Sequence, residues 1–405
     1  MKTNLNAEFS NIVVHQDSFN EEIGTATPRT IHTLAGECVG NKIYLYNMYN
    51  NCICKIDKTT GKIEVECGDN KKPYYEAYLY LKSVVYQHII CFISDKAENV
   101  LKFDTITGKK EWIHFKGNGI DFEPALYESM LYLLPVGYSE QLICIDLTDN
   151  SVKYLPTNYS VRLNRTLRVE PYIYGRPLRL DDWVYRGSNL EPCIQKFNLK
   201  TGAFEYIAVN NFNRPIRSLA FDGEHFWILS KTDGMIACWD EKRNKMLTSI
   251  NLSLESQKED MLYAACFYAN GIVFILEQKG TCILELNVKE FLLESYDCGE
   301  IPGFRMVYQE KQAFAEYIRL GNDGAIYFFP FKCNGVVVKE KNGCVYFYKS
   351  ETVKGLEIAV EQQMQSESTC TLNCFCKKIE MQNRNTVNET NVGTKILLDI
   401  CKTCK

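Results

Sequence analysis

The chain is poor in the residues and motifs that mark most catalytic centres. Only five histidines and four tryptophans occur in its 405 residues, and the histidines show no spacing typical of metal ligands. The sequence contains no glycine-rich phosphate loop, no nucleophile elbow and no HExxH zinc motif. These absences exclude the enzyme classes that such motifs identify. Any catalytic site in this chain has to be assembled from scattered positions.

Strong charge and long hydrophobic runs are also lacking. The formal net charge is −4, so a basic surface for general nucleic-acid binding is not expected. The first ten residues lack the apolar core of a secretory signal. The most apolar run, Leu262–Leu276, is interrupted by Asn270-Gly271, which predicts a hairpin and not a membrane span. We therefore expect a cytoplasmic protein with no nucleic-acid or membrane partner. Without an export signal, its 18 cysteines are expected to be reduced, small apolar residues and not disulfides.

One strand–turn–strand unit recurs seven times along the chain. An apolar strand is followed, roughly ten residues later, by a second strand that ends at an acidic or amide residue. These anchor residues, 42 to 53 residues apart, are Asp57, Asp104, Asp146, Asn198, Asp240, Asn287 and Glu340. The preceding apolar strands are Ile43–Tyr46, Ile90–Ile93, Tyr132–Leu134, Trp183–Tyr185, Phe226–Leu229, Val273–Leu276 and Ile326–Phe329. All-β repeats of about 40–50 residues predict a β-propeller with one blade per unit. We expect seven blades, with six or eight as alternatives.

The residues around each anchor predict how the second strand is buried and how the chain reverses. Positions one and three before the anchor are mainly apolar, whereas the position two before is often charged, as at Lys102 and Lys196. Because residues two apart share a face of a sheet, the apolar positions predict a buried row, and the charges should lean toward a polar face or a blade edge. Asp57-Lys-Thr-Thr-Gly61 and Asp104-Thr-Ile-Thr-Gly108 then predict hairpin turns, since Asp bonds its own backbone and Gly accepts positive φ.

The units resemble the loose "apolar strand, Asp-x-x-Thr-Gly-Lys" repeats of YVTN-type and quinoprotein-like propellers, over roughly residues 30–350. Kelch-type Gly-Gly doublets and Asp-boxes are absent, and Trp239-Asp240 is the single Trp-Asp pair. The regular tryptophans of quinoprotein blades are also missing. The resemblance therefore implies the propeller shape and carries over neither a quinone cofactor nor a catalytic residue.

The rest of the chain flanks the predicted propeller, residues 26–355. Residues 1–25 contain the β-like run Asn11–Val14, which is expected to supply a closing strand. Residues 356–405 are expected to form a short helix at 357–368 and a Cys-rich tail.

The tail contains a candidate metal site. Its cysteines occur at two- to four-residue spacing, which suits zinc or an iron–sulfur cluster. They are Cys370, Cys374, Cys376, Cys401 and Cys404. The alternative interpretation is ordinary thiols, because cysteine is abundant throughout the chain and no histidine lies nearby.

Arginines provide the candidate ligand site. Six of the 13 arginines lie within 25 residues, in and before the first strands of the fourth unit, and two more follow in the next connection. They are Arg162, Arg165, Arg168, Arg176, Arg179, Arg186, Arg214 and Arg217. Loops of a propeller usually carry binding, and guanidinium groups suit carboxylates and phosphates. His225, in a turn near Trp227, could reach a propeller mouth. The alternative is that these arginines are solvated or salt-bridged on the surface and that His225 caps a hairpin.

Two functions remain open at this point. The first is a non-catalytic recognition scaffold that binds an acidic or carbohydrate-like ligand, or a partner protein, through its loop face. The second is a propeller enzyme that acts on glycans or phosphorylated small molecules at the central channel. Converging His, Asp, Glu and Arg side chains at the channel mouth would favour the enzyme.

Overall fold

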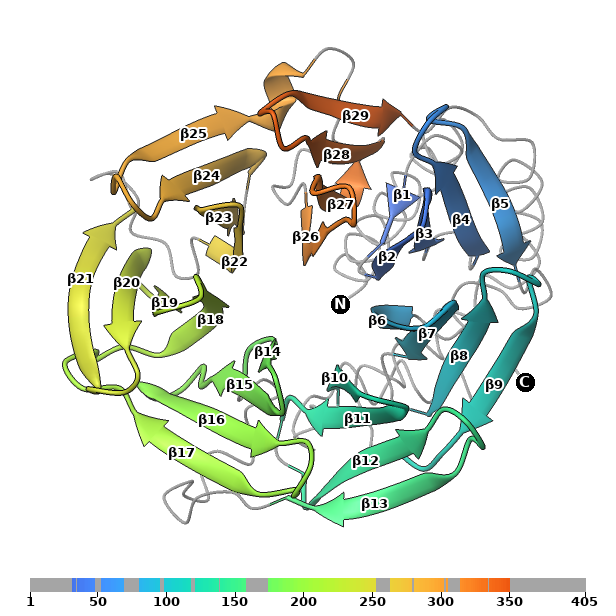
Figure 1. The fold of residues 1–405 in the computed structure, drawn as a ribbon, viewed down its shortest axis with the longest axis horizontal. Helices are drawn as coiled ribbons and strands as arrows, with labels where there is room; N and C mark the ends of the chain where they lie inside the picture. The colour runs from blue at the N-terminus through green and yellow to red at the C-terminus, as the bar shows by residue number, and fades with distance from the viewer. Residues whose placement is uncertain are drawn as a thin grey trace, which may run out of the picture.

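The chain forms a closed ring of seven antiparallel sheets around a central axis in a computed structural model (Figure 1). The structure describes residues 31–33, 35–47, 52–68, 80–94, 98–117, 121–137, 139–157, 174–252, 263–278, 280–301, 304, 314–333 and 335–349. Six sheets have four strands in sequence order, and the seventh has five. The expectation of a seven-bladed, all-β propeller is therefore confirmed. The predicted closing run Asn11–Val14, the helix at 357–368 and the Cys-rich tail lie outside the described residues.

Each blade runs from an innermost strand at the channel to an outermost strand at the rim (Figure 1). The innermost strands are β2 (Gly36–Val39), β6 (Tyr80–Tyr86), β10 (Phe122–Tyr127), β14 (Leu178–Leu180), β18 (Ile216–Phe221), β22 (Tyr263–Ala269) and β26 (Phe314–Leu320). The second strands are β3 (Lys42–Asn47), β7 (Ile89–Ser94), β11 (Met130–Pro135), β15 (Trp183–Gly187), β19 (Phe226–Ser230), β23 (Ile272–Glu277) and β27 (Ile326–Cys333). The third strands are β4 (Cys52–Asp57), β8 (Asn99–Asp104), β12 (Gln141–Asp146), β16 (Cys193–Asn198), β20 (Met235–Asp240), β24 (Cys282–Asn287) and β28 (Gly335–Lys339). The outermost strands are β5 (Ile63–Gly68), β9 (Lys110–His114), β13 (Val152–Pro156), β17 (Phe204–Ala208), β21 (Lys245–Asn251), β25 (Leu293–Asp297) and β29 (Val345–Lys349), and a 3-10 turn, η3 (Cys298–Glu300), follows β25.

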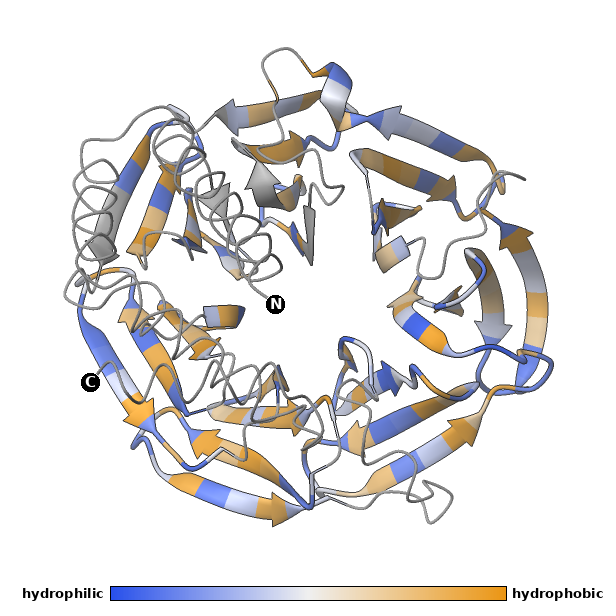
Figure 2. Cartoon of the chain, turned by 180° about the vertical axis from the view of Figure 1, so that it is seen from behind, coloured by the Kyte–Doolittle hydropathy of each residue, from blue (hydrophilic) through white to orange (hydrophobic). Residues whose placement is uncertain are grey.

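The hydrophobic core is divided among the joints between neighbouring blades. One cluster joins blades one and two through Tyr44, Phe92 and Phe103, and another joins blades five and six through Trp227 and Leu286. Second strands are buried on both faces, whereas outermost strands such as β21 alternate between exposed and half-buried residues. Figure 2 shows the same gradient as hydrophobic inner strands and more hydrophilic rim strands. Each blade is thus sealed by its two neighbours.

The anchor residues end the third strands and shape the turns that follow, as predicted. Asp57 Oδ1 accepts hydrogen bonds from the amides of Thr59 and Thr60, both at 3.0 Å. Gly61 closes this turn with a φ of 68°. The turn after β24 differs, because Phe291 takes the position of Gly61 with a φ of 54°.

The charged side chains two positions before the anchor are oriented differently from the expectation. Lys102 is only 7% exposed and does not point to a polar face. Its Nζ donates to Leu147 O at 3.0 Å and to Asn150 Oδ1 at 2.6 Å, both in the next blade. Lys196 likewise reaches Glu241 of the next blade at 2.9 Å. The flexible lysine stem passes through the apolar joint and brings its ammonium to acceptors in the following turn.

The ring closes where a short strand from the start of the described chain joins the sheet of the last blade. β1 (Ile31–His32) pairs with the far end of β27, next to the part of β27 that pairs with β26. The seventh blade therefore contains a strand from the start of the described chain. No helix among these residues is long and apolar enough to cross a membrane.

The antiparallel order gives the disc two different faces. We call the turn face the one with the hairpin turns from first to second and from third to fourth strands. We call the loop face the one with the connections between blades and between second and third strands. β18, for example, begins near Arg214 at the loop face and ends at the Asp222–His225 turn on the turn face.

Candidate functional site

Three of the predicted arginines, Arg176, Arg214 and Arg217, lie at the loop-face ends of blades four and five. Arg217 is the second residue of β18, at a bulge where the register with β19 skips from Ile216 to Ser218. Its Nε donates to Ala264 O of blade six at 3.1 Å. A bulge re-aims the extra residue of a strand. The Arg217 side chain therefore crosses from β18 of blade five to β22 of blade six.

Arg176 is placed next to this strand by two glycines. A Cβ atom on Gly175 would lie 2.4 Å from the carbonyl oxygen of Arg217, and one on Gly187 would lie 2.3 Å from Ile216 Cγ2. Real Cβ atoms do not approach so closely, so glycine at both positions lets blade four pack against the start of β18. Gly175 N also donates to Gly187 O at 2.9 Å. Arg176 follows Gly175 directly. Its backbone therefore lies close to the backbone of Arg217, at the loop-face end of the joint between blades four and five.

Arg214 completes the group and forms an ion pair with Asp233 in the loop after β19. Both side chains are about 39% exposed. Burial acts to raise the pKa of Asp233, but hydrogen bonds from Ser230 and Arg214 outweigh burial and lower the pKa. Asp233 is therefore ionised near neutral pH. Its carboxylate pairs with the Arg214 guanidinium.

Arg186, near the loop-face end of β15, is only 1% exposed. In other blades this position of the second strand is apolar, as at Leu45 and Ile228. The Arg186 guanidinium donates to Pro135 O at 2.7 Å and to Gln195 Oε1, and it lies over the ring of Tyr174 with 4.6 Å to the ring centroid. It joins blades three and four and adds a buried positive charge beneath the loop face.

The structure separates the other predicted residues from this group. Arg179 donates to Leu126 O and to Asp181 O and lies over Tyr127, at the turn-face end of the joint with blade three. His225 lies in the hairpin turn after β18, where its backbone N donates to Asp222 Oδ1 at 2.7 Å. β18 has six residues and is about 20 Å long, so Arg217 and His225 lie toward opposite faces. Arg162, Arg165 and Arg168 lie outside the described residues, as do Cys370, Cys374, Cys376, Cys401 and Cys404.

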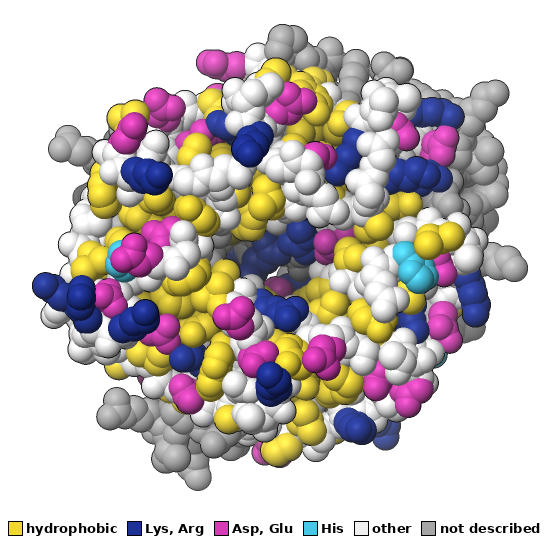
Figure 3. Space-filling model, viewed as in Figure 1, with side chains coloured by type: hydrophobic (Ala, Val, Ile, Leu, Met, Phe, Trp, Pro, Cys, Tyr) yellow, Lys and Arg dark blue, Asp and Glu magenta, His cyan; other side chains and the backbone are white. Residues whose placement is uncertain are grey.

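The central channel carries a second set of charges that the repeat pattern did not predict. Figure 3 shows Lys and Arg side chains around the hollow at the middle of the disc. Among the innermost strands, Arg319 of β26 binds Glu37 of β2 through two hydrogen bonds of 2.9 and 2.8 Å. Lys82 of β6 binds Glu123 of β10 at 2.5 Å and lies 3.5 Å from Asp121. The signs thus alternate around blades seven, one, two and three.

These channel residues are paired with one another, and one of them, Asp121, has a raised pKa. Burial raises the pKa of the Asp121 carboxyl, and the nearby Lys82 ammonium offsets only part of this rise. Asp121 Oδ1 accepts from its neighbour Phe122 N at 2.9 Å. A carboxyl group that keeps its proton to higher pH is one element of acid–base chemistry.

The described residues contain no group of three or more His, Cys, Asp or Glu side chains that could hold a metal ion. The cysteines whose side chains the structure describes have free thiols, most of them on strands. Burial raises the pKa of Cys91 and Cys266 to about 12 in each case. Such thiols are not nucleophilic near neutral pH.

Comparisons with known proteins support the fold. No protein-family model matches the chain, and no curated protein matches it. Among solved structures, a streptogramin B lyase is similar with a TM-score of 0.56 and 10% identity, over 80% of this chain and 95% of that chain. Virginiamycin B lyase from Staphylococcus aureus has a TM-score of 0.56 and 10% identity, over 76% and 94%. The WD40 repeats of RRP9 give 0.52 and 11% identity, over 77% and 88%. At such low identity these similarities show the propeller fold alone.

Proposed function

We propose that this propeller is a non-catalytic recognition scaffold that binds an acidic ligand through the loop face of blades four and five. The ligand is an acidic or carbohydrate-like small molecule, or an acidic segment of a partner protein. The observation that supports this proposal is the placement of Arg176, Arg214 and Arg217 at the loop-face ends of the neighbouring blades four and five. The buried guanidinium of Arg186 adds a positive charge at the adjacent joint between blades three and four.

The chemistry of the group favours an oxyanion. Guanidinium groups bind carboxylates and phosphates through paired N–H donors, and such charge-assisted hydrogen bonds each contribute about 1.5–3 kcal/mol. Arg214 already shows this preference, because it holds the carboxylate of Asp233. A ligand carboxylate or phosphate at this face competes with Asp233 for the Arg214 guanidinium.

Titration calorimetry with three defined probes tests the proposal. The probes are inorganic pyrophosphate, sialic acid and a glutamate-rich peptide, which represent the three ligand classes. We expect at least one to bind the full chain, with an affinity that falls as salt is added. Arg176→Ala, Arg214→Ala and Arg217→Ala should each weaken that binding about tenfold or more.

Arg243→Ala is the matched control. Arg243 lies in the turn after β20 on the turn face, its side chain is 76% exposed, and it pairs with Asp240. The substitution removes the same charge from the opposite face and should leave binding unchanged. Absence of binding by all three probes, or equal losses in the loop-face and control variants, would refute the proposed site.

A specific observation supports a second candidate function, an enzyme that acts on glycans or phosphorylated small molecules at the central channel. The carboxyls of Asp121 and Glu123 share Lys82, and the pKa of Asp121 is raised. A carboxyl with a raised pKa beside a second acidic side chain is an arrangement that can supply a general acid. Turnover of nitrophenyl glycosides or sugar phosphates that is lost in Asp121→Asn would establish this function in place of the first.

A further inference from the structure

Phe291 has a backbone conformation that bulky residues rarely adopt. Its φ is 54°, in the left-handed region. At the same position of the equivalent turns, other blades have Gly or Asn, which tolerate positive φ. These residues are Gly61, Gly108, Asn150, Gly202 and Asn244. A phenylalanine in this conformation is strained, and such strain persists where the surroundings or a function require the residue.

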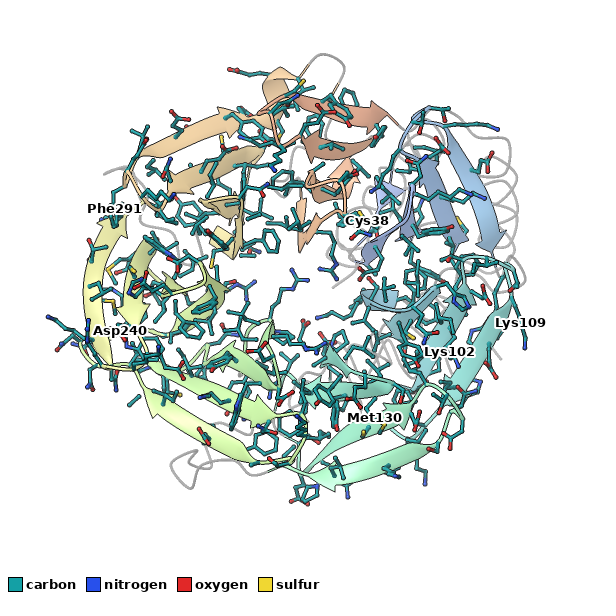
Figure 4. All side chains as sticks on the ribbon, viewed as in Figure 1. Cys38, Lys102, Lys109, Met130, Asp240 and Phe291 are labelled. Carbon is teal, nitrogen blue, oxygen red and sulfur yellow. The ribbon has the colours of Figure 1, made fainter. Side chains whose placement is uncertain are left out.

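The same residue begins a run of exposed apolar side chains at the rim of the turn face. Phe291 is 51% exposed, Leu292 49% and Leu293 36%. Phe291 also leans on Trp227 of blade five, with the ring centroids 6.2 Å apart. Figure 4 shows Phe291 at the edge of the disc. Contact with Trp227 leaves about half of the phenyl group in water, so packing within the chain does not account for a large apolar residue here. We call Phe291, Leu292 and Leu293 the rim knob.

Carboxylates flank the rim knob in the sequence and also lie on the blade-five turn next to Trp227. Glu290 and Glu294 flank it in the sequence and are exposed. On the neighbouring turn of blade five, Asp222 Oδ2 accepts from Trp227 Nε1 at 2.8 Å, and the Glu224 side chain is 83% exposed. Lys289 is the basic residue within the turn itself. The apolar surface is therefore bordered mainly by negative charge.

We propose that the rim knob is a docking site for a partner protein whose contact segment carries apolar and basic side chains. Apolar residues of the partner cover Phe291 and the two leucines, and its Lys or Arg side chains pair with Glu290, Glu294 and Glu224. Exposed apolar patches bordered by polar residues mark interaction sites, and aromatic side chains are frequent anchors in them. The surface is independent of the proposed anion site. It lies in the turn between β24 and β25 of blade six, on the turn face, whereas Arg214 and Arg217 lie at the loop-face end of β18.

Binding of defined peptides to the full chain tests this proposal. One peptide combines Lys with Leu, a second Lys with Ser, and a third Glu with Leu. We expect the Lys–Leu peptide to bind most tightly and to weaken about tenfold or more in Phe291→Asn. Asn accepts the left-handed conformation, so this variant should keep the thermal stability of the parent or exceed it. Ile106→Asn is the control, because Ile106 is 76% exposed in the equivalent turn of blade two.

The alternative outcomes each decide the matter. No preference for the Lys–Leu peptide, or equal binding by Phe291→Asn, overturns the proposal. A large fall in melting temperature for Phe291→Asn assigns the residue to packing on Trp227 and also overturns it. Light scattering that shows a dimer abolished by Phe291→Asn identifies a second copy of the chain as the occupant instead. Retained stability with selective loss of the Lys–Leu peptide supports the docking site.

Discussion

Arg319 in the last blade and Glu37 in the first are joined by two hydrogen bonds across the channel wall. The Ser83 hydroxyl of the second blade donates a hydrogen bond to Glu37 Oε1 at 2.8 Å. Glu37 is 8% exposed and Arg319 26% exposed at the side chain. Three blades are therefore tied by one carboxylate near the closure of the ring, where the short strand β1 joins the seventh sheet.

The first prediction concerns this closure. Glu37→Gln should destabilise the protein by about 3 kcal/mol, because it leaves the partly buried Arg319 without its counter-charge. The double variant Glu37→Gln/Arg319→Met should lose less than the sum of the two single changes. Urea unfolding followed by tryptophan fluorescence measures both effects.

A matched surface pair provides the control for this prediction. Lys62 and Glu64 form an exposed ion pair at 2.8 Å, with side chains 70% and 44% exposed. Lys62→Ala should change stability by less than about 1 kcal/mol. Equal effects of Glu37→Gln and Lys62→Ala would show that the channel pair does not hold the ring closed.

The closure also shows where sequence reasoning reaches its limit. The two middle strands of each blade were predictable, because their apolar rows and anchor residues recur at a fixed offset. Innermost strands such as β2 and β26 have no such anchor, and Glu37 and Arg319 are 282 positions apart in the chain. Their contact depends on the closure of the ring and cannot be derived from local periodicity.

The arginine cluster was predictable only in part. Composition identified the stretch, but each residue's location depends on its place in a strand. Arg176 and Arg217 share the loop face because two glycines allow close packing. Arg179 lies three residues beyond Arg176 and already belongs to the turn face, at the joint with blade three. A buried Arg186 was also unexpected, because the repeat has an apolar residue at this position in other blades.

The second prediction concerns acid stability. Backbone hydrogen bonds within the turns lower the pKa of Asp57, Asp104 and Asp146 from the usual 3.8. Each folded-state pKa is below the unfolded value, so the contribution to stability is complete above pH 3.8 and is lost as the pH falls through the folded pKa. The triple Asp→Asn variant should keep the turns, because Asn198 forms the same bonds. Its free energy of unfolding should therefore vary less between pH 5 and pH 3 than that of the parent. An unchanged pH dependence in the variant would contradict this account.

The third prediction concerns the glycine between blades four and five. Gly175→Ala places a Cβ 2.4 Å from a backbone oxygen, which cannot move as a flexible side chain can. We expect a loss of about 2–3 kcal/mol, from overpacking and displacement of the β18 strand. Gly40→Ala is the comparison, since Gly40 has open space around it and a φ of 56°. Its loss should be about 1–2 kcal/mol, from backbone strain alone. Binding of an anionic probe should also weaken in Gly175→Ala and persist in Gly40→Ala.

The fourth prediction concerns Arg186 and Gln195. Arg186→Met restores the apolar character that this position has in other blades, but it leaves Gln195 Oε1 and Pro135 O without the guanidinium. Loss of those hydrogen bonds should destabilise the protein by about 1–3 kcal/mol. Arg186→Met/Gln195→Leu removes both polar partners and should recover part of that loss, because a dry apolar joint is an adequate substitute for a buried polar pair. Thermal unfolding of the two variants and of Gln195→Leu alone completes the cycle. If the double variant were the least stable of the three, the guanidinium would be required to join blades three and four through Pro135, whatever Gln195 contributes.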